Sequence, residues 1–330
     1  MKNPVKVVLF FFFITFLITN CTSKEYVVIE GFTQGTTYRI VHSDDVGHSL
    51  DSVVAGILFR IDNSLSVYNS ESLISEFNRG YGIIPDSLMI NVFNRSYDIY
   101  KLSDGHFDVS AAPLFNIWGF GSTARSNVTE QILDSAMALI GMDKIVISDG
   151  RLIRKKEGVT LNFNAIAQGY TADVIAEELN RRGVKNYLVE VGGEIMCKGK
   201  NPAGKLWSVG IDKPVDGNII QGAQLQDVLL LDSGGLATSG NYRKFYEQDG
   251  IKYSHTINPK TGYPVSHSLL SATVIAKDAI TADAYATWFM VVGLEKAISI
   301  TENTPGIESY LIYAQQEDFV VYKSSGVKLR

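Results

Sequence analysis

The sequence has little of what builds covalent frameworks and soft metal sites. Its 330 residues include two cysteines, Cys21 and Cys197, which are too few for a disulfide framework or a cysteine-based zinc site. The five histidines show no H-E-x-x-H or other tight ligand spacing. Any metal that this chain binds is therefore expected to be a hard cation held by oxygen atoms.

Positive charge is also scarce. The chain has 30 Lys and Arg against 35 Asp and Glu, a formal net charge of −5, and the basic residues form no long run. Binding to nucleic acid requires clustered Lys and Arg, so we expect no nucleic-acid partner. A hydrophobic fraction of 45% with 20% charged residues is ordinary for a globular protein and excludes a disordered, collagenous or coiled-coil chain.

The N-terminal segment has the pattern of an export signal. Two lysines precede an apolar run, Val7 to Leu17, that is shorter than the roughly 20 residues of a membrane-spanning helix. The following Leu-Ile-Thr-Asn-Cys sequence resembles a bacterial lipobox, although Asn20 replaces the usual Gly or Ala. We therefore expect residues 1–20 to be a lipoprotein signal peptide and Cys21 to carry the lipid. The alternative is an uncleaved membrane anchor.

The remainder, residues 21–330, shows no low-complexity linker and is expected to form one domain outside the cytoplasm, on the periplasmic side and lipid-anchored to the cell membrane. Apolar residues at helical spacing predict helices over residues 50–65, after Thr129, over about 165–182 and over about 282–301. Short runs rich in β-branched and aromatic residues predict strands at 187–191, 207–211, 228–232, 270–276 and 309–314. Helices in the first half and mainly antiparallel strands in the second half favour an α+β fold.

Four segments are richer in glycine and polar residues than folding alone requires. They are residues 31–38 with 66–72, residues 105–121, residues 161–170, and residues 238–243 with 254–262 and 283–287. The last two contain Asn-Ala-Ile-Ala-Gln-Gly-Tyr, Thr-Ser-Gly-Asn-Tyr, Ser-His-Thr-Ile-Asn-Pro-x-Thr-Gly and Ala-Asp-Ala-Tyr-Ala-Thr. In this order, from about Tyr26 to the C-terminal strand, the set resembles the ApbE family of FAD:protein FMN transferases.

The resemblance implies a T-fold-like α+β architecture that binds FAD with Mg²⁺. It also implies transfer of the FMN moiety to a Thr or Ser hydroxyl of a partner protein, a subunit of a membrane respiratory complex, with release of AMP. It places FAD contacts at Gln34, Tyr68, Ser110, Ala111, Ala112, Asn162, Gln168 and His255, and metal contacts at Ala165, Asp283 and Thr287. Gln34 stands where relatives usually have Met, so a flavin contact there is expected through the backbone.

Several of these residues can be interpreted from local chemistry alone. Asn164 occupies a position typical of a helix N-cap, where free amides suit a pyrophosphate. Gly169 then either lets a ligand approach or packs against another element. Asp283 and Thr287, four residues apart on a helix, share one face and suit Mg²⁺. The alternative for Asp283 is a favourable position in the first turn after an N-cap at Thr281.

His255 is the predicted catalytic residue. A Thr hydroxyl is a poor nucleophile, and an imidazole with an ordinary pKa of about 6.5 is well suited to remove its proton. The alternative is that His255 only positions FAD. Trp118 and Phe120 are expected in the core, Cys197 as a buried thiol, and His106 without a role. Two rival functions remain, an FAD pyrophosphatase that makes FMN and AMP, and a lipoprotein that binds flavin without turnover.

The lipobox-like segment generates one prediction. Cys21→Ser should leave an unprocessed precursor without acyl label, because the thiol that accepts the lipid is gone. Metabolic labelling with a radioactive fatty acid, followed by gel electrophoresis, measures both label and processing. A variant that is labelled and processed like the wild type would show that Cys21 is not the anchor.

Overall fold

The computed structural model describes residues 25–47, 49–121, 127–215, 218, 220, 222–241, 245–248, 251–316 and 318–330. The predicted signal peptide and Cys21 therefore lie outside the described residues. Within the described part, no helix is both long and apolar enough to cross a membrane.

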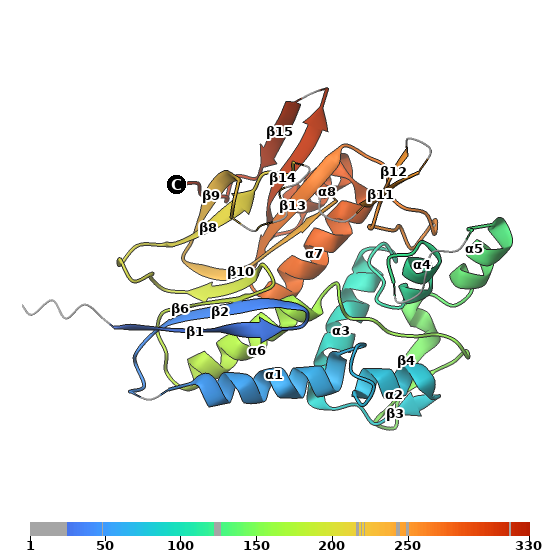
Figure 1. Ribbon diagram of the computed structural model, residues 1–330, viewed down its shortest axis with the longest axis horizontal. Coiled ribbons are helices and arrows are strands. Elements are labelled where there is room, and N and C mark those ends of the chain that lie inside the picture. Colours follow the sequence, from blue (N-terminus) through green and yellow to red (C-terminus); the bar gives the residue numbers. More distant parts are fainter. Residues whose placement is uncertain are drawn as a thin grey trace, which may run out of the picture.

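An eight-stranded antiparallel sheet forms the centre of the molecule, in the order β1-β2-β6-β7-β10-β13-β14-β15 (Figure 1). Its strands are β1 (Tyr26–Thr33), β2 (Thr36–Ser43), β6 (Tyr187–Val191), β7 (Glu194–Lys198), β10 (Ser233–Gly240), β13 (Leu269–Ala276), β14 (Glu308–Gln315) and β15 (Asp318–Lys323). The smaller sheets pair β8 (Trp207–Asp212) with β9 (Leu225–Leu231), β11 (Phe245–Gln248) with β12 (Ile251–Ser254), and β3 (Gly82–Ile83) and β4 (Ile145–Ser148) with β5 (Arg151–Arg154).

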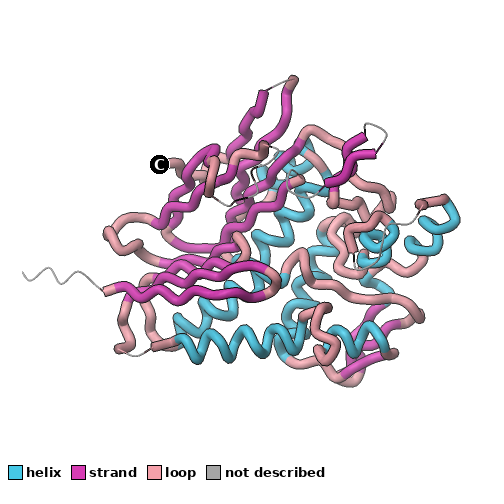
Figure 2. The backbone as a smooth tube through the Cα atoms, in the orientation of Figure 1, coloured by secondary structure: helices cyan, strands magenta, loops and turns pink. Residues whose placement is uncertain are grey.

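Figure 2 shows the strands of the large sheet on one side of the molecule and most helices on the other, with the small β3-β5-β4 sheet among the helices. The helices are α1 (Asp51–Leu65), α2 (Leu73–Arg79), α3 (Ser87–Leu102), α4 (Ala112–Ile117), α5 (Glu130–Met137), α6 (Ala167–Arg181), α7 (Ala279–Val292) and α8 (Leu294–Asn303). Helices α6 and α7 pack directly on the large sheet, and α1 and α3 pack behind them. This arrangement confirms the predicted α+β class.

The two faces of the sheet have separate cores because side chains alternate along a strand. Ala237 of β10 belongs to the large core under the helices, whereas its neighbour Leu236 belongs to a second core with Val209 of β8 and Leu229 of β9. The β8–β9 ribbon therefore covers the face opposite the helices. A third cluster joins α4 and α5 to Ile257.

Several predicted elements are confirmed. The helix over 51–65 forms, Thr129 caps α5 by accepting a hydrogen bond from the Ile132 amide, and the strand at 187–191 has its predicted bounds. The other four predicted strands coincide with parts of β8, β9, β13 and β14. Helices α2, α3 and α4 and strands β1 and β2 were not predicted.

Three local predictions are wrong. The final helix is two helices, because Gly293 has a φ of 81° between α7 and α8. The N-cap of α7 is Asp278, whose side chain accepts a hydrogen bond from the Thr281 amide. Helix α6 begins at Ala167 after the apolar Ile166, so Asn164 is not its N-cap. Asp278 and Gly293 are common helix-end residues, a side-chain N-cap and a glycine with positive φ, so two of the three ends follow local signals.

Gly169 lies where α6 crosses the start of α7. A Cβ atom placed there would lie 2.5 Å from the carbonyl oxygen of Ala279 and 2.8 Å from the Cβ of Asp283. Of the two interpretations open at this glycine, the structure supports the packing one. The close crossing brings Asp283 next to the first turn of α6.

This crossing predicts opposite effects for two helical glycines. Gly169→Ala should lower the free energy of unfolding by about 1–3 kcal/mol, because the added methyl group overpacks the crossing. Gly56→Ala in α1 should raise it by up to about 1 kcal/mol, since a Cβ there meets open space and alanine is the better helix former. Urea titration of both variants measures the difference. Equal effects at the two positions would contradict this account of the crossing.

Candidate active site

A cavity of about 540 Å³ opens between α6, α7, the large sheet and the loops around α4. Ten of the predicted site residues line one of two adjoining cavities. The larger cavity is lined by Tyr68, Ala111, Ala112, Asn162, Ala165, Gln168, His255, Asp283 and Thr287, whereas Gln34 lines a smaller adjoining cavity of about 220 Å³. The tertiary structure thus brings together residues separated by more than 200 positions in the chain.

Ser110 is the exception among the predicted flavin contacts. It is fully buried, its hydroxyl donates to Asp108 Oδ1 at 2.6 Å, and it accepts a hydrogen bond from the Gly141 amide at 2.7 Å. It is not among the residues that line the cavity. Ser110 therefore holds the loop that carries Ala111 and Ala112 rather than contacting a ligand itself.

Asp283 is buried in the second turn of α7, at the cavity wall. Its Oδ2 accepts a hydrogen bond from the Gly169 amide at 3.0 Å. Burial raises the pKa of its carboxyl group well above the ordinary value, the Gly169 hydrogen bond lowers it, and the charge of Asp173 raises it further. A cation bound here would favour the charged form and bind with release of a proton.

Thr287 lies one turn further along α7 and also lines the cavity. Its hydroxyl lies 3.5 Å from the hydroxyl of Ser239 on β10. A carboxylate with neighbouring hydroxyls is a set of hard oxygen donors that fits Mg²⁺. Among the residues that the structure describes, no group of three or more His, Cys, Asp and Glu could hold a metal ion. Water and substrate phosphates would have to complete the coordination.

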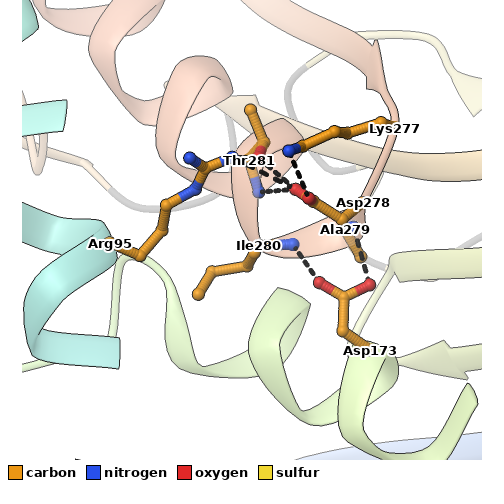
Figure 3. Close-up of polar contacts among 7 residues, drawn as sticks. All are labelled: Arg95, Asp173, Lys277, Asp278, Ala279, Ile280 and Thr281. Atoms are coloured by element: carbon orange, nitrogen blue, oxygen red, sulfur yellow. Dashed lines mark hydrogen bonds and ion pairs between the residues drawn. The ribbon is translucent and has the colours of Figure 1, made fainter. Parts of the chain in front are cut away.

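Polar contacts with α3 and α6 hold the start of α7, the helix that carries Asp283 (Figure 3). The carboxylate of Asp173 on α6 accepts hydrogen bonds from the amides of Ala279 and Ile280, both at 2.8 Å. Arg95 of α3 forms an ion pair with Asp278 at 3.5 Å and a hydrogen bond to Thr281. Burial raises the pKa of Asp173, the two amide bonds lower it, and Asp278 raises it. Side chains from α3 and α6 thus fix the first turn of α7.

The segment before α6 is held by its own hydrogen bonds. The Asn162 amide donates to the carbonyl of Val109 at 2.8 Å, and its side-chain oxygen accepts from the Asn164 amide at 2.9 Å. The side chain of Asn164 donates to the Tyr68 hydroxyl at 3.2 Å. Tyr68 itself is 81% exposed at the rim of both cavities, where a planar ring could stack on it.

The two residues on either side of His255 are held by one hydrogen-bond partner. The hydroxyls of Ser254 and Thr256 both donate to Asn241 Oδ1, at 2.7 and 2.6 Å. His255 lies between these two residues, and it lines the cavity. Its ring lies 6.3 Å from that of Phe120 in an edge-on arrangement. Phe120 thus lines the cavity and also packs against the third hydrophobic cluster, as a partly buried residue.

The structure also shows the surroundings of Trp118, Cys197 and His106. Trp118 is buried, and its indole donates to the carbonyl of Gly262 at 2.8 Å, which confirms its place in the core. Cys197 is buried, and burial raises the pKa of its thiol to about 12, so it is unreactive. His106 lies in a loop, as expected, and also lines the cavity, with Nδ1 2.8 Å from the carbonyl oxygen of Ser103.

Three cavity carboxylates were missed. Asp108 lies two residues before Ser110 and lines the cavity. Burial raises its pKa to about 6, although hydrogen bonds from Ser110 lower it. Glu194 and Asp212 lie at strand ends and carry no local motif. The Asp108 position could have been found from the polar segment that contains it. The other two become visible only when β7 and β8 are placed beside the cavity.

The chain matches known proteins over nearly its whole length. The model of the ApbE family matches residues 34–311. The FAD:protein FMN transferase of Vibrio cholerae is 33% identical over 322 residues, 94% of this chain and 95% of that protein. The enzyme of the same name from Haemophilus influenzae is 33% identical over 324 residues, 93% and 92% of the two chains.

Solved structures agree with this match. The flavin transferase ApbE from Vibrio cholerae has a TM-score of 0.81 at 32% identity and covers 92% of this chain and 98% of its own. The flavinyl transferase ApbE from Pseudomonas stutzeri has a TM-score of 0.82 at 32% identity, covering 92% and 95%. Since both the sequence match and the fold extend over almost the entire chain, this protein belongs to the ApbE family.

Proposed function

We propose that this chain transfers the FMN moiety of FAD to a Thr or Ser hydroxyl of a partner protein, with Mg²⁺ and with release of AMP. One observation carries the proposal: a single cavity holds an oxygen-donor pair, Asp283 and Thr287, together with the imidazole of His255. The names of the relatives, FAD:protein FMN transferase, support the same reaction.

The residues of this chain have separate tasks in that reaction. The acceptor hydroxyl oxygen attacks the phosphorus atom of the FMN half, and the bond from that phosphorus to the bridging oxygen of AMP breaks. His255 takes the proton of the hydroxyl. Asp283 and Thr287 hold the cation, which when bound neutralises charge on the diphosphate. The small side chains of Ala111 and Ala112 and the ring of Tyr68, which line the cavity, would bind planar parts of FAD.

The two rival functions differ in product. A pyrophosphatase would use water in place of the acceptor hydroxyl, and a binding protein would make no product. A carboxylate that is buried at an energetic cost beside a cavity favours catalysis over simple binding. Incubation with FAD, Mg²⁺ and a candidate acceptor distinguishes the three. A fluorescent acceptor band on a denaturing gel supports transfer, AMP without labelling supports hydrolysis, and neither product supports binding.

The proposed location of the enzyme is the periplasmic side of the cell membrane. The lipobox-like segment ending at Cys21 would anchor the enzyme to the membrane on the periplasmic side. Acceptors would then be extracytoplasmic domains of membrane respiratory complexes. The net charge of −5 agrees with a partner other than nucleic acid.

Asp283→Asn should abolish Mg²⁺-dependent turnover and, without divalent cations, stabilise the protein at alkaline pH. The raised pKa means that native Asp283 binds its proton more tightly than the unfolded chain does. The wild type therefore loses stability as the pH rises above the ordinary carboxyl pKa of about 4, up to the raised native pKa. The neutral amide has no such loss and can still accept the Gly169 hydrogen bond.

Thermal melts in EDTA between about pH 5 and pH 9 measure this difference, which should grow with pH. Mg²⁺ should raise the melting temperature of the wild type and leave that of the variant unchanged. Glu295→Gln on the exposed surface of α8 removes one charge away from the cavity and serves as the control. If the melting temperatures of the wild type and Asp283→Asn differ by a constant amount across the pH range, or if the variant turns over FAD with Mg²⁺, the assignment of Asp283 is wrong.

His255→Ala should lower the rate of FMN transfer by about 10²- to 10⁴-fold, the usual contribution of a general base. Affinity for FAD should change little, and the wild-type rate should fall in acid as the imidazole is protonated. Single-turnover kinetics and fluorescence titration measure the two quantities separately. His267→Gln is a matched control, because His267 bonds the carbonyl of Met290 at 2.8 Å and does not line either cavity described above. Weak FAD binding with a near-normal rate would make His255 a binding residue instead.

A further inference from the structure

The smaller cavity differs from the larger one in its chemistry. Carboxamide side chains dominate its polar wall, and these are Gln34, Asn164 and Gln168. Asp62, Ser66 and Tyr68 add further polar groups. Tyr68, Asn164 and Gln168 line both cavities, so the two adjoin. A volume of about 220 Å³ is too small for a whole dinucleotide and suits one end of a ligand that lies mainly in the larger cavity.

Gln34 is held in this cavity by a directional hydrogen-bond chain. The hydroxyl of Thr171 donates to the carbonyl of Ala167 at 2.7 Å. Its oxygen is therefore left to accept, and it accepts from Nε2 of Gln34 at 2.6 Å. Since this bond assigns Nε2 to the Thr171 side, the orientation of the amide is fixed. One N–H of Nε2 and the lone pairs of Oε1 are left for other partners.

The backbone at Gln34 is unusual as well. Gln34 has a φ of 49° and Gly35 a φ of 74°, which makes the β1–β2 connection a tight turn with both residues left-handed. Asn, Asp or Gly is the usual residue at the first of these positions, so glutamine there is retained at some conformational cost. The turn places the side chain of Gln34 against α6 and the cavity. The hydrogen bond to Thr171 thus holds the amide of Gln34 beside α6.

We infer that the smaller cavity recognises the imide edge of the isoalloxazine ring, and that the Gln34 carboxamide determines this specificity. That edge carries an N–H between two carbonyl oxygens. A fixed carboxamide offers the complementary acceptor and donor side by side, Oε1 for the N–H and Nε2 for one carbonyl. A methionine in its place would offer no donor and only a weak acceptor. The inference rests on the proposed function in taking FAD as the substrate.

Binding of FAD and of 3-methyl-FAD, in which the imide N–H is replaced, tests this inference. Both are titrated in EDTA, where Mg²⁺-dependent turnover is excluded, and flavin fluorescence reports binding. For the wild type, 3-methylation should weaken binding about 10-fold or more, because a buried acceptor loses its donor. Gln34→Met should weaken FAD binding and reduce the penalty of 3-methylation to about 3-fold or less.

Two further variants sharpen the result. Thr171→Val removes the acceptor that orients the Gln34 amide and should also reduce the penalty. Gln131→Met, an exposed position on α5, makes the same change of side chain away from both cavities and should keep the wild-type penalty. Circular dichroism melts check that each variant is folded.

The outcomes separate this inference from the proposed function. Equal affinity of the wild type for FAD and 3-methyl-FAD, or an unchanged penalty in Gln34→Met, overturns the inference while FMN transfer can stand. A Gln34-dependent penalty without FMN transfer supports the inference and overturns the proposed reaction. No flavin binding by the folded wild type overturns both.

Discussion

The hydrogen bonds from the Ala279 and Ile280 amides to the Asp173 carboxylate are the constraint on which the site depends. They fix the first turn of α7 to the middle of α6, and Gly169 allows the two helices to approach closely enough for this contact. Asp283, one turn after these amides, is then brought to the Gly169 amide at the wall of the cavity. Placement of the candidate metal ligand is thus a consequence of helix packing.

This arrangement places two carboxylates in a poorly solvated region. Burial raises the pKa of both Asp173 and Asp283, and each carboxylate has backbone amides as partners. Asp173 uses both oxygens to hold α7, so its role is structural. Asp283 receives one amide bond and lies at the cavity, so a cation can stabilise its charged form there. The free-energy cost of burying the charged Asp283 carboxylate is expected at a site that binds a ligand.

Two neighbouring hairpin turns complete the site from the other side. The β1–β2 turn places Gln34 on Thr171 of α6. The β6–β7 turn brings Gly192, with a φ of 68°, against the amide of Gln168, where any Cβ would come within 2.6 Å of Nε2. Strands β2 and β6 pair, so both turns lie at the same end of the sheet. The start of α6 therefore lies beside both turns, and its Gln168 lines both cavities.

The sequence by itself determined the features that depend on near neighbours in the chain. Helical spacing predicted α1, Thr129 was found as the cap of α5, and the four-residue separation of Asp283 and Thr287 placed them on one face. The order of the motifs indicated the family, and most residues expected in the site do line one of the two cavities. The helical features follow from periodicity and hydrogen bonding over a few residues, whereas most of the site residues were implied by the resemblance to the ApbE family.

Only the tertiary structure decided what depends on distant segments. It assigned Gly169 to a helix crossing, moved Ser110 out of the cavity wall, and brought His106 and Phe120 into it. No local pattern reports these outcomes, because each is set by which surfaces meet when α6, α7 and the sheet pack together.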